Sequence, residues 1–501
     1  MTAATPNASS GQPTASAATL VLQFASGPIV FLLLSLLPYG GVPPEGRTAL
    51  GVFGWMVMWW MARPVPWAVA SILPLILFPM FNVMNVGATV VLYGQNIFFW
   101  IWGTVLMGYA MDRHGLAKRF ALWFMSLKWV NGSANRTAFG FMLVTGLISM
   151  MLSDAATVAV MIPVAVSLVA FVRTVQPQKD GEGKSNFGAF LALGALYGSV
   201  AGGTATIAGI PHNALSVALL EQLTGRALGW FEWMVAGVPV FVVLLLVFYF
   251  VLLFFLPPEF KVVPGGTEFL RAERAKLGPL SAGEKSTLFV FAMMVTLFVL
   301  PTALGLTLGA GNPVTVWART GLNLYVVPPI VLLLLFGTPV DWRRGQYVLG
   351  WREAVTHTPW DIMILVASAT GVVNALVEFR FVELAGEAVA GLGFGDVTLA
   401  FVASVVVAFS TNVISGVAAT SFFGGLFIPA AQEVGWNPAA MAILIPNAAV
   451  GIALPWAGAS CGTAFATGQI EMKDMIKIGM VATLVFAFAI AAVHLLMAPF
   501  V

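Results

Sequence analysis

Two long apolar segments of this 501-residue chain are each interrupted midway by polar and small residues, and this feature restricts the possible folds more than any other. The segments cover residues 134–170 and 397–430. In lipid, backbone that leaves a helix must be buried in protein or must line a water-filled cavity. We therefore predict that each segment enters the membrane, turns and leaves on the same side as a re-entrant hairpin.

Eleven further apolar stretches are long enough to cross a bilayer, which takes about 20 residues. They lie at 21–39, 48–62, 66–90, 94–112, 188–220, 231–256, 286–307, 322–337, 360–379, 439–468 and 474–500. With 59% hydrophobic and 9% charged residues, the chain has too little charge to cover the surface of a soluble domain. The predicted fold class is an all-α polytopic membrane protein with about eleven transmembrane helices and two re-entrant helical hairpins.

The distribution of Lys and Arg predicts how the chain is oriented. Residues 1–20 contain no Lys or Arg, which predicts a disordered tail rather than a signal peptide. If the N-terminus is cytoplasmic, nineteen of the 23 basic residues lie inside and only Arg47, Arg226, Arg319 and Arg380 lie outside. Cytoplasmic loops of membrane proteins carry such an excess of basic residues. We expect a bacterial-type inner-membrane protein with a cytoplasmic N-terminus and an external C-terminus.

The composition argues against several other functions. A formal net charge of +2 gives no reason to expect a nucleic-acid partner. Four His and the single Cys461 form no cluster with metal-ligand spacing, and neither GxSxG nor a phosphate loop occurs. We therefore expect no enzyme activity and no organic cofactor. The expected partners are a small anionic substrate and membrane lipid.

An internal duplication relates the two halves of the chain. Residues 101–121 and 366–386 have the same order of apolar span, charged turn and amphipathic stretch, and each is followed by a hairpin, a Gly- and Thr-rich broken span and a long apolar helix. The broken spans contain residues 198–213 and 451–468. One copy begins outside and the other inside, so the repeats are inverted. Inverted repeats with interrupted helices are typical of secondary transporters, which bind substrate where the interruptions meet. Alternatively, the small residues only allow close helix packing.

The broken helices could bind an anion without a basic side chain, since every Lys and Arg is expected in a loop or at a span end. Free N–H groups and the positive dipole ends of helices attract anions, and hydroxyl groups can donate hydrogen bonds. Free carbonyls and C-terminal helix ends suit a small cation such as sodium. The same features could also bind a zwitterion.

The two hairpins resemble the paired Ser-Asn-Thr signatures of the divalent-anion:sodium symporter family, the di- and tricarboxylate carriers. In the first copy, SDAATVAVMIP, an aspartate replaces the asparagine. In the second, TNVISGVAATSFFGGLFIP, the distance to the final proline is about four residues too long. The residues at motif positions are Ser153, Asp154, Ala155 and Thr157 in the first hairpin and Thr411, Ser415, Gly416 and Val417 in the second.

The broken spans carry the second part of the resemblance. The family pattern Gly-Gly-x-Gly-Thr-x-x-Gly-Thr-Pro-Pro-Asn is similar to GGTATIAGIPHN here. The first copy matches at Gly202, Gly203, Thr206, Gly209, Pro211 and Asn213, with His212 in place of the second proline. The second copy matches at Pro455 and Ala457, whereas Ala459, Ser460 and Cys461 replace Pro-Pro-Asn.

The resemblance implies a homodimer that works as an elevator, in which a transport domain moves against a scaffold domain. It implies carriage of a dicarboxylate, citrate or sulfate together with sodium. The implied division is a tail at 1–20, scaffold at 21–130 and 285–390, transport domain at 131–258 and 391–501, and a cytoplasmic connector at 259–284.

The resemblance also implies the binding residues. The first sodium site would comprise Ser153, Asp154, Gly202 and Gly203, and the second Thr411, Ser415, Gly416, Pro455 and Ala457. Substrate would contact Ser153, Asp154, Ala155, Thr157, Pro211, His212, Asn213, Ser415, Gly416, Val417, Ala459 and Ser460.

Asp154 is the most informative departure from the family pattern. A carboxylate inside the bilayer is expensive and usually functional, and here it would face an anionic substrate. It must therefore bind a sodium ion or take up a proton, or else it caps the helix that follows. Loss of asparagine at Gly416 removes a side-chain carbonyl from the second sodium site. We accordingly predict a secondary active transporter of small multivalent anions, with a dicarboxylate as first choice, coupled to sodium or protons. The alternatives are an uncoupled exchanger, a sulfate or tricarboxylate carrier, an intramembrane enzyme and a channel.

Overall fold

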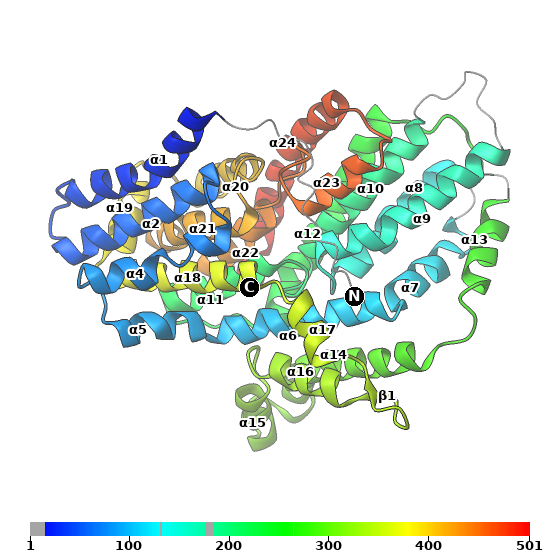
Figure 1. Cartoon of the computed structure of the whole chain (residues 1–501), viewed down its shortest axis with the longest axis horizontal. Helices are drawn as coiled ribbons and strands as arrows, with labels where there is room; N and C mark the ends of the chain where they lie inside the picture. The colour runs from blue at the N-terminus through cyan, green and yellow to red at the C-terminus, as the bar shows by residue number, and fades with distance from the viewer. Residues whose placement is uncertain (1–15, 131–132, 176–184, 264) are drawn as a thin grey trace.

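The computed structural model describes residues 16–130, 133–175, 185–263 and 265–501, and the secondary structure of this part of the chain is helical apart from two short strands (Figure 1). The helices before the first predicted hairpin are α1 (Ala17–Leu36), α2 (Pro44–Ala62), α3 (Trp67–Ala70), α4 (Leu73–Met80), α5 (Val86–Val91), the 3-10 helix η1 (Leu92–Gly94), α6 (Asn96–Arg113) and α7 (Leu116–Met125). Next come α8 (Ala134–Ser149), α9 (Asp154–Val175), α10 (Asn186–Gly203), α11 (Pro211–Thr224), α12 (Trp230–Phe255) and α13 (Gly266–Ala275).

The second half repeats this order after an inserted segment. The insert comprises α14 (Ala282–Leu308), α15 (Pro313–Gly321), α16 (Val327–Gly337), the short strands β1 (Pro339–Asp341) and β2 (Gln346–Tyr347), and α17 (Trp351–His357). The repeat follows as α18 (Trp360–Glu378), α19 (Phe381–Ala390), α20 (Asp396–Ser410), α21 (Gly416–Glu433), α22 (Pro438–Ala448), α23 (Ala459–Ala466), α24 (Met472–Met497) and the 3-10 helix η3 (Ala498–Phe500).

All eleven predicted spans contain helix, and seven helical stretches of the described chain are long and apolar enough to cross a membrane. The predicted span at 66–90 differs from a single helix, because it consists of the three short helices α3, α4 and α5. Prolines at the start and end of α4 and the left-handed backbone of Asn82, with φ of 58°, interrupt the helical hydrogen bonds there.

The predicted disordered tail at 1–20 is wrong at its C-terminal end. Helix α1 begins at Ala17, and the Ser16 hydroxyl caps it by accepting a hydrogen bond from the Thr19 amide at 3.2 Å. Serine is among the most favourable residues for this position, so the polar sequence starts the helix rather than preventing it. Residues 1–15 lie outside the described part of the chain.

Both predicted hairpins are present as pairs of helices joined by tight turns. Helices α8 and α9 are joined through residues 150–153, and α20 and α21 through residues 411–415. The second helix of each pair begins in the same register, since the Ser153 carbonyl accepts from the Thr157 amide and the Ser415 carbonyl from the Ala419 amide, both at 2.9 Å. The Ser415 hydroxyl also caps α21 through the Ala418 amide at 3.2 Å. The polar residues of each segment therefore form its turn.

The two repeats pack against each other reciprocally. Helix α9 of the first hairpin packs on α23 of the second broken span, and α21 of the second hairpin packs on α11 of the first. The long helices α12 and α24, which end the two repeats, also pack together. An inverted repeat gives such exchanged contacts, because each copy supplies the surface on which the other copy's hairpin lies.

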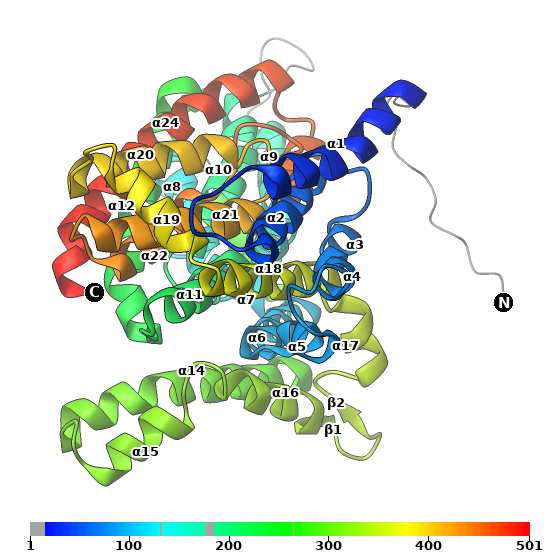
Figure 2. The ribbon, with the colours of Figure 1, turned by 90° about the vertical axis from the view of Figure 1, so that its left-hand side faces the viewer.

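Two buried apolar clusters hold the fold together. The smaller cluster joins α1, α2 and α4 to α18 and α19, and the larger one contains the hairpins, the broken spans, α12 and α24. The insert lies at one edge of the molecule, where α14, α15 and α16 are side by side in both views (Figures 1 and 2). The hairpins therefore lie within the larger cluster, and the second one also contributes Ala418 to the smaller cluster.

Candidate functional site

Both predicted breaks occur where the sequence places them. Helix α10 ends at Gly203 and α11 begins at Pro211, while α22 ends at Ala448 and α23 begins at Ala459. Proline at the first position of α11 fits a helix start, where its missing N–H group would have no partner. Together with the hairpin turns, the breaks provide four helix N-termini and four C-termini. Such ends offer free N–H groups to anions and free carbonyl groups to cations.

Asn213 holds the first break in shape. Its side-chain amide nitrogen donates to the carbonyls of Gly203 and Thr206, both at 2.9 Å, and the residue is completely buried. Thr206 in turn donates from its hydroxyl to the Met150 carbonyl in the turn of the first hairpin. The first break and the first hairpin turn are thus one hydrogen-bonded unit.

Asn412 plays the corresponding part in the second repeat, although it was not predicted as a site residue. Its side-chain oxygen accepts from the Ala453 amide at 2.9 Å, and its nitrogen donates to the Ala408 carbonyl at 3.2 Å. The break is further closed by the Cys461 thiol, which donates to the Gly451 carbonyl at 3.2 Å. The sequence did contain a signal for this residue, namely a carboxamide next to Thr411 in a largely apolar hairpin turn. Asn412 lay outside the positions that were matched to the family motif.

His212 and Gly416 bring the two repeats into contact. A Cβ atom at Gly416 would lie 2.9 Å from His212 Cε1 and would also collide with the Ala449 carbonyl. The second hairpin turn, the start of α11 and the end of α22 therefore meet at one point. This confirms that the interruptions of the two copies converge inside the protein.

Several polar atoms around this point are buried without a hydrogen-bond partner in the described structure. They are Thr157 Oγ1, His212 Nε2, Asn213 Oδ1 and Thr420 Oγ1. Buried polar groups are nearly always paired, so each unpaired one needs an explanation. These four lie near the starts of α9, α11 and α21, the helices that begin at the hairpin turns and the first break.

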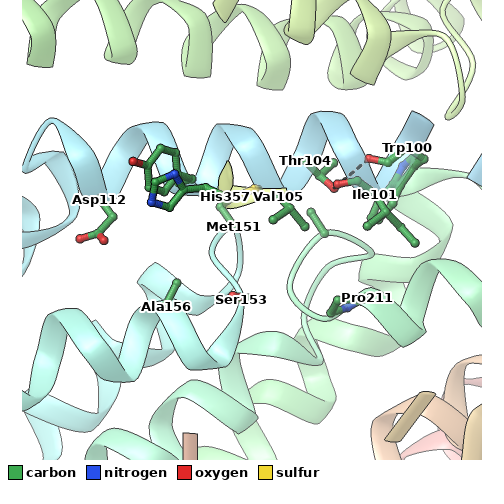
Figure 3. A pocket seen from close by; sticks show the side chains of 13 residues that line it. Trp100, Ile101, Thr104, Val105, Asp112, Met151, Ser153, Ala156, Pro211 and His357 are labelled. Carbon is green, nitrogen blue, oxygen red and sulfur yellow. Dashed lines mark hydrogen bonds between the residues drawn. The ribbon is translucent and has the colours of Figure 1, made fainter. Parts of the chain in front are cut away.

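A cavity of about 180 Å³ separates the first hairpin turn from α6 (Figure 3). Ser153, Ala156 and Pro211 line one side, with Ala208 from the loop of the first break. The opposite wall is formed mainly by α6 and includes Thr104, Tyr109 and Asp112, with His357 from α17. Among the lining residues there is no Lys or Arg, as the sequence predicted for the interior. The α6 and α17 residues were not predicted, because no local motif marks them.

Contacts with α6 hold helix α17 beside this cavity. The Tyr109 hydroxyl donates to the Glu353 carboxylate at 2.9 Å, and Arg113 forms an ion pair with the same carboxylate. The Tyr109 and His357 rings are stacked with centroids 4.1 Å apart. These contacts give the mouth a fixed shape and leave the Asp112 carboxylate exposed beside it.

Asp154 is the first residue of α9 and is half-buried. It forms no ion pair with any residue that the structure describes. Its carboxylate lies at the positive end of the helix dipole, which stabilises a negative charge only in part. The site therefore contains an uncompensated acidic group next to Ser153, which lines the cavity.

The remaining predicted site residues differ in how closely they are packed and in how exposed their side chains are. Gly202 lies against Gly146 of α8 so closely that a Cβ atom would overlap the Gly146 carbonyl, and Gly203 lies against Ile210. Gly451 is similarly pressed against the Thr411 carbonyl and Ala457. The side chains of Ala155 and Ala459 are exposed, those of Ser415 and Ser460 are buried, and those of Pro455 and Val417 lie between these limits. Glycine is needed at Gly202 and Gly451 because backbone approaches backbone there, whereas Gly203 faces the Ile210 side chain.

The donor groups at the site suit sodium rather than a transition metal. Within the described residues no group of three or more His, Cys, Asp or Glu could hold a metal ion. The C-terminal ends of α8, α10, α20 and α22 instead supply carbonyl oxygens, and Ser153, Asp154 and Thr411 add further oxygens at the turns. Oxygen ligands of this kind at unwound helix ends coordinate sodium in secondary transporters.

Comparison with known proteins agrees with this geometry. The chain matches the family model of the sodium:sulfate symporter transmembrane region over residues 18–499. It is 27% identical over 485 residues to the sodium-dependent dicarboxylate transporter SdcS of Staphylococcus saprophyticus, covering 94% of this chain and 90% of that one. It is 26% identical to SdcS of Staphylococcus aureus, covering 95% and 90%.

A solved structure supports the fold alone. The Alcanivorax borkumensis YdaH transporter superposes with a TM-score of 0.53 at 16% identity, covering 83% of this chain and 87% of that one. The family and the similar proteins are transporters, so the chain is a multi-pass membrane transporter and not an enzyme. The match over nearly the whole chain, with inverted repeats and convergent breaks, shows that this protein belongs to the sodium:sulfate symporter family.

Proposed function

We propose that this protein is a sodium-coupled carrier of small dicarboxylates. The observation that carries the proposal is the convergence of His212, Gly416 and Ala449, which joins both repeats at one buried point beside a cavity whose lining contains no Lys or Arg. Helix N-termini at this point supply N–H groups for carboxylates, and nearby carbonyl oxygens suit sodium. The similarity to sodium-dependent dicarboxylate transporters supports this choice of substrate and ion.

The surroundings of the two hairpins differ, and this difference supports an elevator mechanism in which the hairpins and broken spans move together. At the first hairpin a cavity with polar groups separates Ser153 from α6. At the second hairpin, α21 packs on α18 and α19, and the space left between these helices is lined almost entirely by apolar side chains. We take the polar cavity at the first hairpin as the side from which the site is reached in this state. In the proposal, residues 131–258 and 391–501 form the transport domain, residues 21–130 and 285–390 the scaffold, and residues 259–284 the connector.

The proposed assembly is a homodimer with a cytoplasmic N-terminus and an external C-terminus. The basic residues support this orientation, which places the first hairpin on the cytoplasmic side. Many apolar side chains of α1 and α14 are exposed, and they suit contact with lipid or with a second protomer. Glutaraldehyde cross-linking in detergent would give a dimer band, and exclusive recovery of monomer would contradict the assembly.

Uptake into proteoliposomes tests the proposed function. Labelled succinate should accumulate when an inward sodium gradient is imposed and should fail to accumulate with potassium in its place. Unlabelled sulfate, citrate and malate in excess would then define the substrate class by competition. Succinate uptake without any sodium dependence would refute sodium coupling, while no uptake of any dicarboxylate would refute the substrate assignment.

Proton coupling is the second candidate, and the uncompensated carboxylate of Asp154 favours it. A carboxylate next to an anionic substrate must gain a cation, and a proton would serve as well as sodium. Asp154→Asn carries no charge and restores the amide of the family motif. If Asp154 carries the coupling ion, this variant should change the sodium or pH dependence of uptake. An unchanged dependence on both would leave Asp154 as a helix cap only.

A further inference from the structure

A second cavity, of about 370 Å³, lies between the helices α2, α18 and α19 and the second hairpin helix α21. Its walls include Leu50 and Phe53 of α2, Phe381 of α19 and Phe422 of α21. The only polar side chains in its lining are those of Tyr39 and Ser421. The cavity is thus separate from the proposed transport site and differs from it in chemistry.

The content of this cavity must be apolar. Helix α18 is long and apolar enough to cross a membrane, and residues 48–62 of α2 form a predicted span. Water gains too few hydrogen bonds in an apolar cavity to remain there, and an empty space would deprive the lining side chains of packing partners. Phe422 is 39% exposed, so the cavity reaches the protein surface, where hydrocarbon surrounds a membrane protein.

Two arginines are close in sequence to residues that line the cavity. Arg47 lies one turn before Leu50 on α2, and Arg380 immediately precedes Phe381. The first turn of α2 packs on the end of α18, since a Cβ atom at Gly46 would lie 2.7 Å from Phe379 Cβ. The arginines are therefore on neighbouring helix ends. Neither forms an ion pair with any described residue, and Arg47 Nε is buried without a hydrogen-bond partner.

Carboxylates alternate with these arginines. Glu45 lies two residues before Arg47, while Glu378 and Glu383 flank Arg380. A headgroup with a phosphate and an ammonium group complements this mixture better than a purely anionic one does. Tyr39, whose ring meets that of Phe381 edge-on with centroids 5.1 Å apart, adds a hydroxyl to the lining of the cavity.

We propose that this cavity binds a phospholipid, with one acyl chain inside it and a phosphoethanolamine headgroup at Arg47 and Arg380. The lipid lies between α21 of the second hairpin and the helices of the smaller apolar cluster. It therefore fills the boundary along which the second hairpin would have to slide. A bound acyl chain fills the space along that boundary and can change its conformation as the helices move. The side chains of α21 then need not be complementary in shape to those of α2, α18 and α19.

Native mass spectrometry of the purified protein with added phosphatidylethanolamine tests the proposal. Wild type should retain one phospholipid per protomer. Gly425→Leu narrows the cavity, since the nearest atom to a Cβ there is Val373 Cγ2 at 3.9 Å, and it should weaken retention. Gly337→Leu adds the same side chain where nothing lies within 4 Å, and it should retain lipid like wild type. Arg47→Gln and Arg380→Gln should each weaken retention about five-fold, as expected for one basic residue near lipid phosphate.

Equal retention by wild type, Gly425→Leu and Gly337→Leu would overturn the proposal, as would retention of phosphatidylglycerol in preference to phosphatidylethanolamine. If Gly425→Leu fails to fold, Ala388→Phe narrows the same cavity from an exposed position of α19. Undiminished lipid retention by that variant would likewise overturn the proposal. The readout is lipid binding, so the result does not depend on which substrate the protein carries.

Discussion

The side-chain oxygen of Asn412 accepts a hydrogen bond from the backbone amide of Ala453 at 2.9 Å, and this bond ties the turn of the second hairpin to the second helix break. Asn412 is 4% exposed and Ala453 is completely buried, so no water can replace the bond. The first repeat makes an equivalent link through Thr206 and the Met150 carbonyl. Each hairpin is thus fixed to the broken helix of its own repeat, while it packs on that of the other.

Replacement of Asn412 by alanine should destabilise the protein by about 1–3 kcal/mol, because the Ala453 amide would be left unpaired in a water-free site. A lowered midpoint of thermal unfolding in detergent would show this loss. Asn323→Ala provides a matched control, since Asn323 also accepts from a backbone amide, that of Tyr325 at 3.0 Å, but is exposed. Equal midpoints for the two variants would contradict the role given to Asn412.

Gly416→Ala should strongly reduce transport while leaving expression intact. The added methyl group would meet the Ala449 carbonyl and His212 Cε1, so the second hairpin turn would be displaced from the first break. Succinate uptake should fall about ten-fold or more, as expected when misplacement of a binding group costs roughly 1.4 kcal/mol or more. Gly337→Ala, where nothing lies within 4 Å, is the control and should transport normally.

His212 is expected to contact the substrate through its unpaired Nε2 atom. His212→Ala should therefore raise the KM for dicarboxylate about ten-fold, the effect of losing one hydrogen bond to a charged group. His494 provides the contrast, because it is also buried but binds the Ile490 carbonyl at 2.9 Å within α24. His494→Ala should lower the unfolding temperature without changing KM. A raised KM in His494→Ala alone would reverse this assignment.

The Tyr325 hydroxyl donates to the Glu221 carboxylate at 2.6 Å and connects the loop before α16 to α11. If α11 moves with the hairpins, this bond exists in the present state and breaks during transport. Tyr325→Phe should therefore shift the equilibrium away from this state by about 0.5–1.5 kcal/mol. Double electron–electron resonance between spin labels on α11 and α15 would detect the shift. An unchanged distance distribution would mean that the two elements move together.

Much of the fold could be predicted because lipid makes strict local demands on a chain. Backbone must stay helical in hydrocarbon, so apolar runs predicted the spans, and polar interruptions predicted the turns that the structure shows at 150–153 and 411–415. The breaks before Pro211 and Ala459 followed from Gly- and Thr-rich sequence in the same way. The prediction of one continuous span at 66–90 was wrong, because the prolines of α4 and the left-handed backbone of Asn82 divide this apolar run into short helices.

The sequence by itself determined that this protein crosses the membrane repeatedly, contains an inverted duplication and interrupts its helices at four places. Only the tertiary structure decided that α21 lies on α11 and α9 on α23, that Asn412 reaches Ala453, and that Asp112 and His357 face Ser153 across a cavity. The physical reason is the distance along the chain between the groups that interact. Helix, turn and break are set by hydrogen bonding within a few residues, whereas the partners in each of these pairs come from distant segments that meet only when the helices pack.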